Sequence, residues 1–513
     1  MKSRTLTCIT AMTLFACLAF PMGLAAQKEP LEKIHRYKLV VIGTLGGPQS
    51  YGDAGHNAAN VNKHGVAVGV ADTDMPDPLY PNFNPGLTQL IGAYPFIYHA
   101  FTTRGGTILD LGALPGGTNS VSSFITENGL VSGQSLNGDI DPLTGWPEMN
   151  AVLWKDGKII NLGTLGGHES GAGQVNSRGQ VTGVSTNSVP DPFSFLYPGV
   201  SNGTQTRAFV WDEKNGMQDL GTLGGPDAFA PLINEGGQIA GFSFTNFAPN
   251  STTGLPTLDP FLWENGRMID LGTLGGTFGV VGGLFALNRR GQVVGQSNLA
   301  GDVISHPFLW TAPGPMLDLG SLGGTFEGAN TMNDAGTGIG GGTLAGDQVF
   351  HAFIWEHGVM TDLGTVGGND CSNAFGINAK DQVVGDAFPC NVNAIPHPFL
   401  WEKGDIIDLN VFVPAGSDLT LVGAEEINDH GEIFGIGTLS NGDARAFLLI
   451  PVGDGDPEGI SATPENLAAL AAKTGQISVS ATQSRKVPRD MAAVWRSRFT
   501  GRYHLPSLGT PKD

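Results

Sequence analysis

The chain has 513 residues, 77 of them glycine, and it carries 27 Lys and Arg residues against 47 Asp and Glu residues, a formal net charge of −20. This acidity argues against nucleic acid as a partner, because binding to a phosphate backbone requires clustered Lys and Arg. Length alone predicts several domains, but internal repetition overrides that expectation, since a repeat array can form one closed unit. No segment after the N-terminal region is long and apolar enough to be read as a membrane span.

Residues 1–26 have the layout of a secretory signal peptide: Lys2 and Arg4 precede an apolar run that includes "LFACLAF", and the small residues "GLAA" follow. An uncleaved membrane anchor is the alternative, but the run is short for a bilayer span. Acylation of Cys17 is rejected, because Phe15 stands where a lipoprotein signal needs a small residue. We therefore predict export, to the periplasm, cell surface or medium, and a linker over 27–36. Because residues 1–26 hold two basic and no acidic side chains, cleavage changes the net charge from −20 to −22.

From residue 37 onward the chain repeats a string related to "MIDLGTLGG" (268–276). Aligned on this string, it follows a four-part cycle of segments like "AFGIN", "GQVVG", "PFLW" and "DLG". Each part is rich in Val, Ile, Phe or Trp and is bounded by Gly, Asn or Asp, which is typical of strands. The connecting "N-x-x-G" and "W-x-x-G" segments predict tight hairpins, with Asn opening a type I turn and Gly in a left-handed conformation.

These strands are apolar on consecutive residues, so both faces of each small sheet must be covered, as when sheets stack radially. The tryptophans that mark the third strand are 45 to 57 residues apart, the spacing of one four-stranded blade; they are Trp154, Trp211, Trp263, Trp310, Trp355 and Trp401. A linear solenoid is the competing interpretation, but it needs polar caps at both ends. Here the lone strands 37–47 and 444–452 would complete one blade together. We predict an all-β, eight-bladed β-propeller of four-stranded antiparallel blades over 37–452, closed by the N-terminal strand.

The two glycines of "TLGG" are expected to supply positive φ and close backbone approach at a sharp crossover between blades. A phosphate-binding loop is rejected, because no helix and no Lys-Ser/Thr pair follow. The aspartate of "DLG" is predicted to be structural, accepting backbone N–H groups near the crossover, and the tryptophans are predicted to pack between blades. These aspartates are Asp110, Asp219, Asp270, Asp318, Asp362 and Asp408, with Asn161 in one copy.

The loops between the second and third strands are long in the first four repeats, at 71–98, 135–149, 185–206 and 246–259. One arc of one face should therefore carry a raised wall, and loops held by a rigid scaffold are where binding usually occurs. Aromatic residues suited to stacking on sugars or packing on a protein are Tyr80, Phe83, Tyr94, Trp146, Phe195 and Tyr197. Carboxylates suited to Ca²⁺ are Asp72, Asp74, Asp77, Asp139, Asp141 and Asp191. The alternatives are aromatics that pack the loops together and carboxylates that are solvated or form Asp-Pro turns.

Cys371 and Cys390 are the cysteines left after signal cleavage, and they are predicted to form a disulfide across a hairpin whose turn, "NAKDQ", lies midway between them. Residues 453–513 are predicted to be a linker and a basic arm. "TPENLAALAAKTG" predicts a helix with Thr463 as N-cap and Gly475 as stop, and "VPRDMAAVWRSRFTGRY" predicts a second helix. Disorder of this arm is the alternative.

The tripeptides "HAF" at His99 and His351 and "HPF" at His306 and His397, with the "DLGTLGG" and "GQVVG" strings, resemble the HAF family of extracellular repeat proteins. The resemblance covers about 37–452 and implies export and a repeat scaffold, but no reaction or ligand. The pattern departs at Thr103 and Leu449, where Trp is usual, and at 409–419, where the Gly-Gly crossover is missing. The strand order is also similar to that of Kelch-type propellers, an analogy of fold alone.

The sequence contains no nucleophile motif, no HExxH and no paired glutamates at catalytic spacing. Quinoprotein dehydrogenases also have eight blades, but in their motif Gly precedes the docking Trp, whereas here Trp precedes Gly. We predict a monomeric, non-enzymatic binding or scaffold propeller without a cofactor, calcium left open, that binds a glycan or an extracellular protein on the long-loop face. One alternative is a carbohydrate-active enzyme such as a lyase, with loop carboxylates and histidines converging on the central channel. Another is a purely structural surface protein.

Overall fold

The computed structural model describes residues 35–52, 60–80, 95–104, 107–194, 203–251, 254–390 and 395–476. The predicted signal peptide, nearly all of the 27–36 linker and the second C-terminal helix lie outside these residues. The described part of the chain is all-β apart from two short helices, η1 (Leu409–Phe412) and α2 (Pro464–Gln476). No helix in this part has the length and hydropathy needed to cross a membrane.

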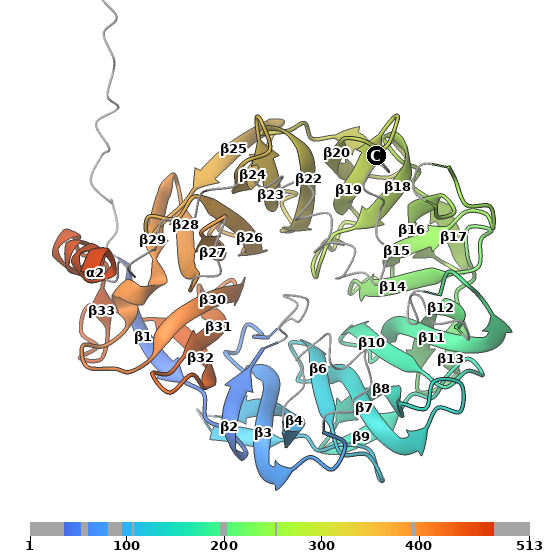
Figure 1. The fold of residues 1–513 in the computed structure, drawn as a ribbon, viewed down its shortest axis with the longest axis horizontal. Helices are drawn as coiled ribbons and strands as arrows, with labels where there is room; N and C mark the ends of the chain where they lie inside the picture. The colour runs from blue at the N-terminus through green and yellow to red at the C-terminus, as the bar shows by residue number, and fades with distance from the viewer. Residues whose placement is uncertain are drawn as a thin grey trace, which may run out of the picture. The chain divides into compact units, whose positions relative to one another are not determined.

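The strands form four-stranded antiparallel meanders that follow the predicted four-part cycle (Figure 1). The first four meanders are β2 (Gly46–Tyr51), β3 (Val68–Pro76), β4 (Phe96–Arg104) and β5 (Thr107–Asp110); β6 (Ser120–Ile125), β7 (Val131–Ile140), β8 (Pro147–Lys155) and β9 (Lys158–Asn161); β10 (Ser170–Val175), β11 (Val181–Pro190), β12 (Thr204–Asp212) and β13 (Gly216–Asp219); β14 (Ala228–Ile233), β15 (Ile239–Phe244), β16 (Leu258–Glu264) and β17 (Arg267–Asp270).

The later meanders are β18 (Gly275–Val281), β19 (Val293–Leu299), β20 (Ser305–Trp310) and β21 (Leu317–Asp318); β22 (Gly323–Met332), β23 (Gly338–Leu344), β24 (Phe350–Glu356) and β25 (Val359–Gly364); β26 (Cys371–Ile377), β27 (Val383–Phe388), β28 (His397–Glu402) and β29 (Asp405–Asp408). The last group joins both ends of the array: β30 (Thr420–Ile427), β31 (Ile433–Thr438), β32 (Ala444–Pro451), β1 (Arg36–Val41) and β33 (Ile460–Ser461).

The first and last strands of the array pair as the sequence predicts. β1 runs antiparallel to β32, with Leu39 opposite Leu449. The two-residue strand β33 adds to the other edge of β1, inside the segment predicted to be a linker, so the start of the C-terminal arm is held on the N-terminal strand. A strand this short carries no periodicity from which it can be predicted.

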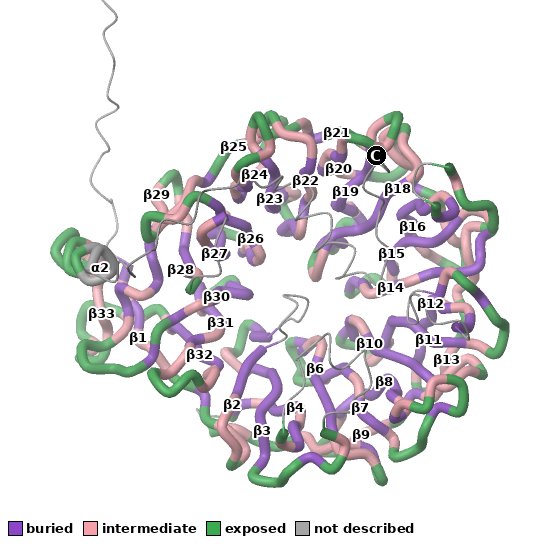
Figure 2. Tube along the Cα trace, viewed as in Figure 1, coloured by how far each residue is buried: buried purple, intermediate pink, exposed green. Residues whose placement is uncertain are grey.

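Within residues 35–476 each meander contacts the next, and the last contacts the first through β32 and β2, so that the sheets form a closed cycle. Apolar residues from both ends of the chain share one cluster there, with Ala71 and Phe101 packed against Phe434 and Leu448. Buried residues follow the strands, whereas exposed residues gather at the outer turns (Figure 2). Burial on both sides of each sheet explains the consecutive apolar residues.

The meanders are not all separate sheets, which differs from the prediction. β16 and β18, and likewise β20 and β22, are linked by one parallel bridge each, Leu258 to Phe278 and Ser305 to Phe326, so that β14 to β25 form one continuous sheet. The outer strands β17 and β21 have only four and two residues. Each bridge lies at the start of the third strand, outside the residues that pair with β17 or β21.

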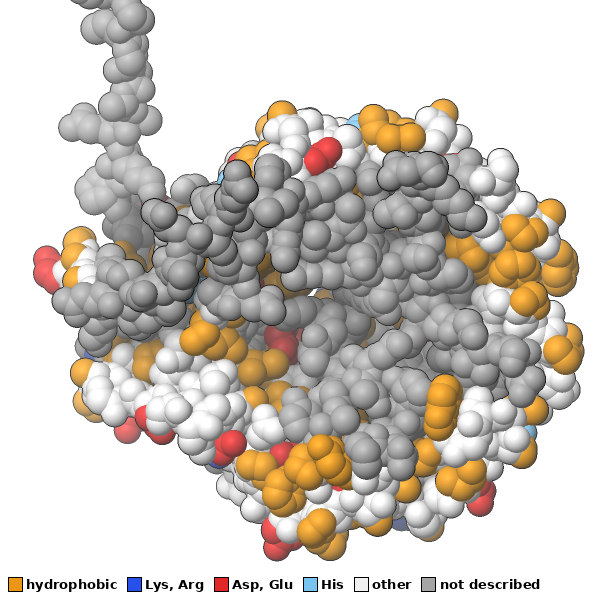
Figure 3. All heavy atoms as spheres, viewed as in Figure 1, with side chains coloured by type: hydrophobic (Ala, Val, Ile, Leu, Met, Phe, Trp, Pro, Cys, Tyr) orange, Lys and Arg blue, Asp and Glu red, His pale blue; other side chains and the backbone are white. Residues whose placement is uncertain are grey.

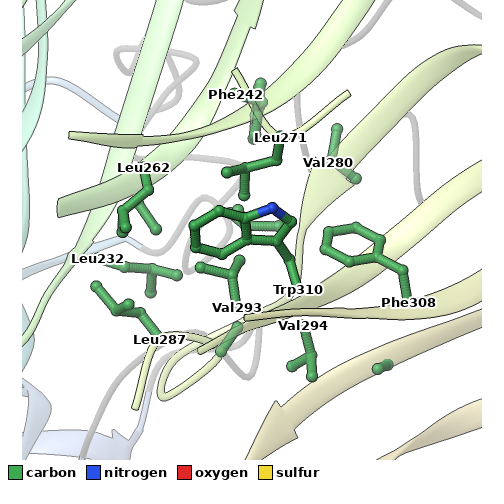
Figure 4. Packing of buried hydrophobic residues seen from close by; sticks show 14 of the residues in the cluster. Leu232, Phe242, Leu262, Leu271, Val280, Leu287, Val293, Val294, Phe308 and Trp310 are labelled. Carbon is green, nitrogen blue, oxygen red and sulfur yellow. The ribbon is translucent and has the colours of Figure 1, made fainter. Parts of the chain in front are cut away.

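The predicted inter-blade packing of the tryptophans is present at Trp310. This side chain is 5% exposed and lies in a cluster with Leu232, Leu262 and Leu271 of the preceding meander (Figure 4). The Nε1 of Trp154 also donates across a meander boundary, to the carbonyl of Leu111 at 2.8 Å. Both tryptophans therefore make contacts between neighbouring sheets.

The predicted disulfide and the predicted helix cap are present as well. Cys371 and Cys390 form a disulfide, with their Cα atoms 5.3 Å apart. The hydroxyl of Thr463 accepts a hydrogen bond from Asn466 N at 3.2 Å and caps α2. The helix continues through Gly475, the expected stop, to Gln476.

Of the two crossover glycines, the first has the positive φ and the second allows the close backbone approach. Gly116 has a φ of +89°, and a Cβ on Gly117 would lie 1.8 Å from the carbonyl oxygen of Leu136. We expect Gly117→Ala to lower the free energy of unfolding by about 1–3 kcal/mol, because backbone must move to remove the clash. Gly43→Ala is the control, since its Cβ would meet nothing within 4 Å. Urea denaturation of both variants tests this, and equal stability of the two would contradict the close-approach explanation.

Candidate functional site

Asparagines of the "N-x-x-G" turns form a belt that links neighbouring meanders. In Asn378, Oδ1 accepts hydrogen bonds from Lys380 N at 3.0 Å and Gln382 N at 3.1 Å, which closes the turn. Its Nδ2 donates to the carbonyl of Asn428 in the next meander at 3.0 Å. Asn428 in turn donates to the carbonyl of Asn62 at 3.0 Å and so joins the last meander to the first.

The remaining links follow the same rule, with Thr126 as the exception. The other asparagines that donate to the following turn are Asn62, Asn176, Asn234, Asn288 and Asn333. Where Thr126 replaces Asn, Asn128 bonds to the carbonyl of Ser177 instead, at 3.0 Å. The "N-x-x-G" pattern predicts only the turn role of these asparagines. The signal for the second role was that Asn recurs where Asp or Ser would serve the turn equally well.

A cavity of about 220 Å³, called the central cavity below, is lined by the belt residues and the ends of the inner strands. It lies at the tight-hairpin ends of the strands, opposite the ends that carry the long loops. Its apolar lining includes Ile125, Val175 and Ile233 together with Phe124 and Phe285, whose ring centroids are 5.8 Å apart. Phe285 is 40% exposed and has a φ of +61°, a strained conformation for a bulky residue that recurs at functional sites.

Carboxylates from alternate meanders line the central cavity: Glu127, Glu235, Asp334 and Asp429, called the rim carboxylates below. Each accepts a hydrogen bond from a backbone N–H of the preceding meander's turn, such as Lys63 N to Glu127 at 3.1 Å and Ala379 N to Asp429 at 2.9 Å. Glu235 bonds to Ser177 N, and Asp334 to Arg289 N. Lys63 and Arg289 are the basic residues of the same lining. The negative charges are thus oriented and spread around the cavity.

Two deeply buried polar side chains also line the central cavity. Gln174 is 3% exposed, and its Oε1 accepts from Ile233 N at 2.9 Å. Glu426 is 8% exposed, and its Oε2 accepts from Val61 N at 3.0 Å and from Asn60 N. Burial raises the pKa of Glu426 to about 8, against the opposing effect of these two bonds. Its carboxyl is therefore mostly protonated at neutral pH.

Two of the aspartates predicted as loop ligands, Asp77 and Asp141, lie in Asp-Pro turns. Asp77 is 6% exposed: its Oδ1 accepts from Leu79 N at 2.8 Å, and its Oδ2 accepts from Asn119 Nδ2 at 2.6 Å. Asp141 begins a matching Asp-Pro turn, with Leu143 N at 2.7 Å. The Asp-Pro-turn interpretation therefore describes these two residues, whose carboxylates stabilise the turns through backbone N–H groups.

The other predicted loop residues differ in exposure. Asp72 and Asp191 are buried, Asp74 and Tyr80 are exposed, and Trp146 is half-buried. Tyr94, Phe195 and Tyr197, with Phe83, lie outside the described residues. In the ranges that the structure covers, no three His, Cys, Asp or Glu side chains are placed to hold a metal ion.

In the first meanders, the second strand extends into the loop that is predicted to form the raised arc. β3, β7 and β11 of the first three meanders have nine or ten residues, whereas β15 of the fourth meander has six, like β27 and β31. The strands are thus extended in three of the four repeats for which a long loop was predicted. The extensions carry exposed apolar side chains, including Met75, Ile140 and Val189. Figure 3 shows hydrophobic side chains grouped over β2 and β3 on the face that it presents. The wall remains a predicted binding surface.

The repeated histidines pair with the "DLG" aspartates of the neighbouring outer strand. Nδ1 lies 3.0 Å from the carboxylate in His99–Asp110 and 2.6 Å in His397–Asp408. The aspartate also accepts the expected backbone N–H, as in Gly112 N to Asp110 at 2.7 Å. The hydrogen bond with Asp408 raises the pKa of His397. His306 and His351 pair in the same way with Asp318 and Asp362, and no histidine appears among the described residues that line the central cavity.

Comparisons with known proteins identify no family. No family model matches the chain, and no similar sequence was found among curated proteins. Among solved structures, Pyrococcus horikoshii acylaminoacyl peptidase is 12% identical with a TM-score of 0.34, over 68% of this chain and 52% of that one. Trypanosoma rangeli sialidase is 10% identical with a TM-score of 0.31, over 72% and 58%. An oligogalacturonate lyase in complex with manganese is 10% identical with a TM-score of 0.32, over 82% and 99%. The chain thus spans between half and three fifths of the first two proteins, and at this level of similarity none of these activities transfers to it.

Proposed function

We propose that the chain is an exported, eight-bladed β-propeller of the HAF-repeat type that acts as a non-enzymatic binding module, with its ligand in the central cavity. Eight blades are supported by the turn positions of the belt, one for each group of strands that continues the cycle. Export is supported by the Cys371–Cys390 disulfide, which persists in oxidising compartments.

The observation that carries the proposal is a cavity whose polar lining is already oriented. Glu426, Gln174 and the rim carboxylates are each held by backbone N–H groups of their own or a neighbouring meander. A site fixed in this way loses little conformational entropy when a ligand binds. On the long-loop face, in contrast, Asp77 and Asp141 are engaged in Asp-Pro turns, and Asp77 also accepts from Asn119 Nδ2.

The lyase alternative requires histidines and carboxylates that converge on the channel. The described lining supplies the carboxylates, while His99, His306, His351 and His397 are engaged with outer-strand aspartates. A proton-transfer residue must be within reach of the substrate to act. The binding module is therefore the better-supported function.

The test is calorimetric binding of a neutral oligosaccharide, an oligogalacturonate, spermidine, a lysine-rich peptide and calcium. We expect at least one probe to bind the wild-type protein and to lose binding in Ala379→Trp, which places a ring at an exposed, uncharged residue of the cavity lining. Val359→Trp is the matched control, because Val359 is 62% exposed at an outer hairpin. Binding that survives Ala379→Trp but is lost in Tyr80→Ala would move the site to the long-loop face. Binding of no probe would overturn the module.

A further inference from the structure

A second, smaller cavity of about 30 Å³ adjoins the central cavity and shares Phe285, Ile377, Glu426 and Ile427 with it. This volume holds one group the size of a water molecule. We call it the inner pocket. Its lining adds Thr331 and Glu425, two side chains that the proposed function does not use.

The hydroxyl of Thr331 indicates that the inner pocket binds a ligand. The residue is 3% exposed, and its Oγ1 has no hydrogen-bond partner among the described residues. An unpartnered buried hydroxyl is costly, so such an atom calls for a partner. Glu426 lines the same pocket with a carboxyl of which one oxygen is committed to Val61 N and Asn60 N. The two side chains together form an acceptor site of about the size of an ammonium group.

The rim carboxylates set the character of the rest of the ligand. They come from alternate meanders, so their charges surround the opening and cannot converge on one metal ion, in agreement with the absence of a metal-holding group in the described ranges. Four carboxylates outnumber Lys63 and Arg289 in this lining. Spaced negative charge attracts a chain with spaced positive charges, and the Phe124–Phe285 pair adds aromatic surface to the same lining, on which a cation can pack.

We infer that the central cavity binds a flexible aliphatic amine, with one primary ammonium group in the inner pocket against Thr331 and Glu426 and its further charges along the rim carboxylates. This inference rests on the proposed function and names the ligand class of the same site. The source is a free polyamine or a lysine side chain of a polypeptide, which share the ammonium group.

Binding should release a proton. The ammonium donates to Thr331 and Glu426, and the carboxyl of Glu426, mostly protonated before binding, loses its proton to solvent when a cation enters beside it. The other titratable or charged groups that line the two cavities are Glu425, Lys63, Glu127, Glu235, Arg289, Asp334 and Asp429. No bond to carbon is made or broken in this step.

The test is calorimetry with spermidine at pH 7 in two buffers of different ionisation enthalpy. We expect Thr331→Val, which removes the hydroxyl at nearly constant shape, to weaken spermidine about tenfold, the effect of one hydrogen bond to a charged group. Glu426→Gln should abolish proton release. Spermidine acetylated at both primary amines should not bind, and Val359→Trp should bind like the wild-type protein. A lysine-rich peptide that binds in place of spermidine, with the same Thr331→Val loss, supports the ammonium site and assigns a polypeptide source.

The outcomes separate this inference from the proposed function. If a neutral or anionic probe binds and is blocked by Ala379→Trp while both amines fail, the function stands and the ammonium site is overturned. If spermidine binds equally well to Thr331→Val and without proton release, the inner pocket holds water and the inference is also overturned. If no probe is sensitive to Ala379→Trp, both proposals fall.

Discussion

Replacing Trp310 with alanine is expected to lower the free energy of unfolding by about 3–5 kcal/mol, the usual cost of truncating a buried tryptophan. The side chain is 5% exposed and fills the space between two meanders (Figure 4). It packs against Leu262 and Leu271 of the preceding meander and against Val293 of its own meander. A cavity left there cannot collapse without moving one sheet relative to the next. Chemical denaturation monitored by circular dichroism measures the change.

Val303→Ala is the matched control for Trp310, because Val303 is 68% exposed on the loop that precedes the same strand, β20. This variant should change the stability by less than about 0.5 kcal/mol. If Trp310→Ala were as mild as the control, packing of Trp310 between meanders would not determine the stability of the fold. The other apolar residues of the strands would then account for the contact between sheets.

The protein is expected to lose stability as the pH rises from about 5 to 9. Burial raises the pKa of Asp386 to about 7 and of Glu327 to about 8. It also raises the pKa of Asp227 to about 10, assisted by a hydrogen bond with Asp191. Each of these acids stays protonated in the folded state over a pH range where the unfolded chain is ionised. The folded state therefore binds more protons, and its stability falls by about 1.4 kcal/mol per pH unit and per group between the unfolded and the folded pKa.

His397 acts in the same direction. Its pKa is raised by Asp408, so the stability that it contributes is fully present below the unfolded pKa and is lost as the pH rises through the folded value. Asp110 and Asp362 limit the pH range of high stability on the acid side. Burial opposes their ionisation, but hydrogen bonds from histidine and backbone lower both pKa values, so their contribution is lost at strongly acidic pH. Stability should therefore be greatest in mildly acidic solution.

Asp227→Asn isolates the largest of these effects. The variant keeps a neutral side chain of the same shape, so its melting temperature should match that of the wild-type protein near pH 5 and exceed it increasingly toward pH 9. Thermal melting across this range measures the difference. An unchanged pH dependence would show that Asp227 is ionised in the folded protein and does not contribute to the loss of stability at high pH.

Local pattern was enough to predict much of this fold. Turn residues act within a few positions of themselves, so the "N-x-x-G" and "W-x-x-G" segments marked the hairpins, and Gly116 and Gly117 marked a crossover. Pairing of β1 with β32 followed from counting unpaired strands at the two ends of the array. The Cys371–Cys390 disulfide followed from symmetry about one turn. Each inference needed only neighbours along the chain or a repeat compared with itself.

The candidate site was decided by contacts between repeats, which no single repeat contains. The sequence showed Asn378 as a turn residue, but only the closed cycle of sheets brings its Nδ2 to Asn428. Asp77 and Asp141 are loop carboxylates in the sequence, and only the structure shows the backbone N–H groups that bond to them. The cavity beside Phe285 and Glu426 exists because inner strands from several meanders end around one axis. Periodicity determined the strands and their order, whereas the chemistry at the centre depends on which side chains from distant repeats meet in a confined, poorly solvated space.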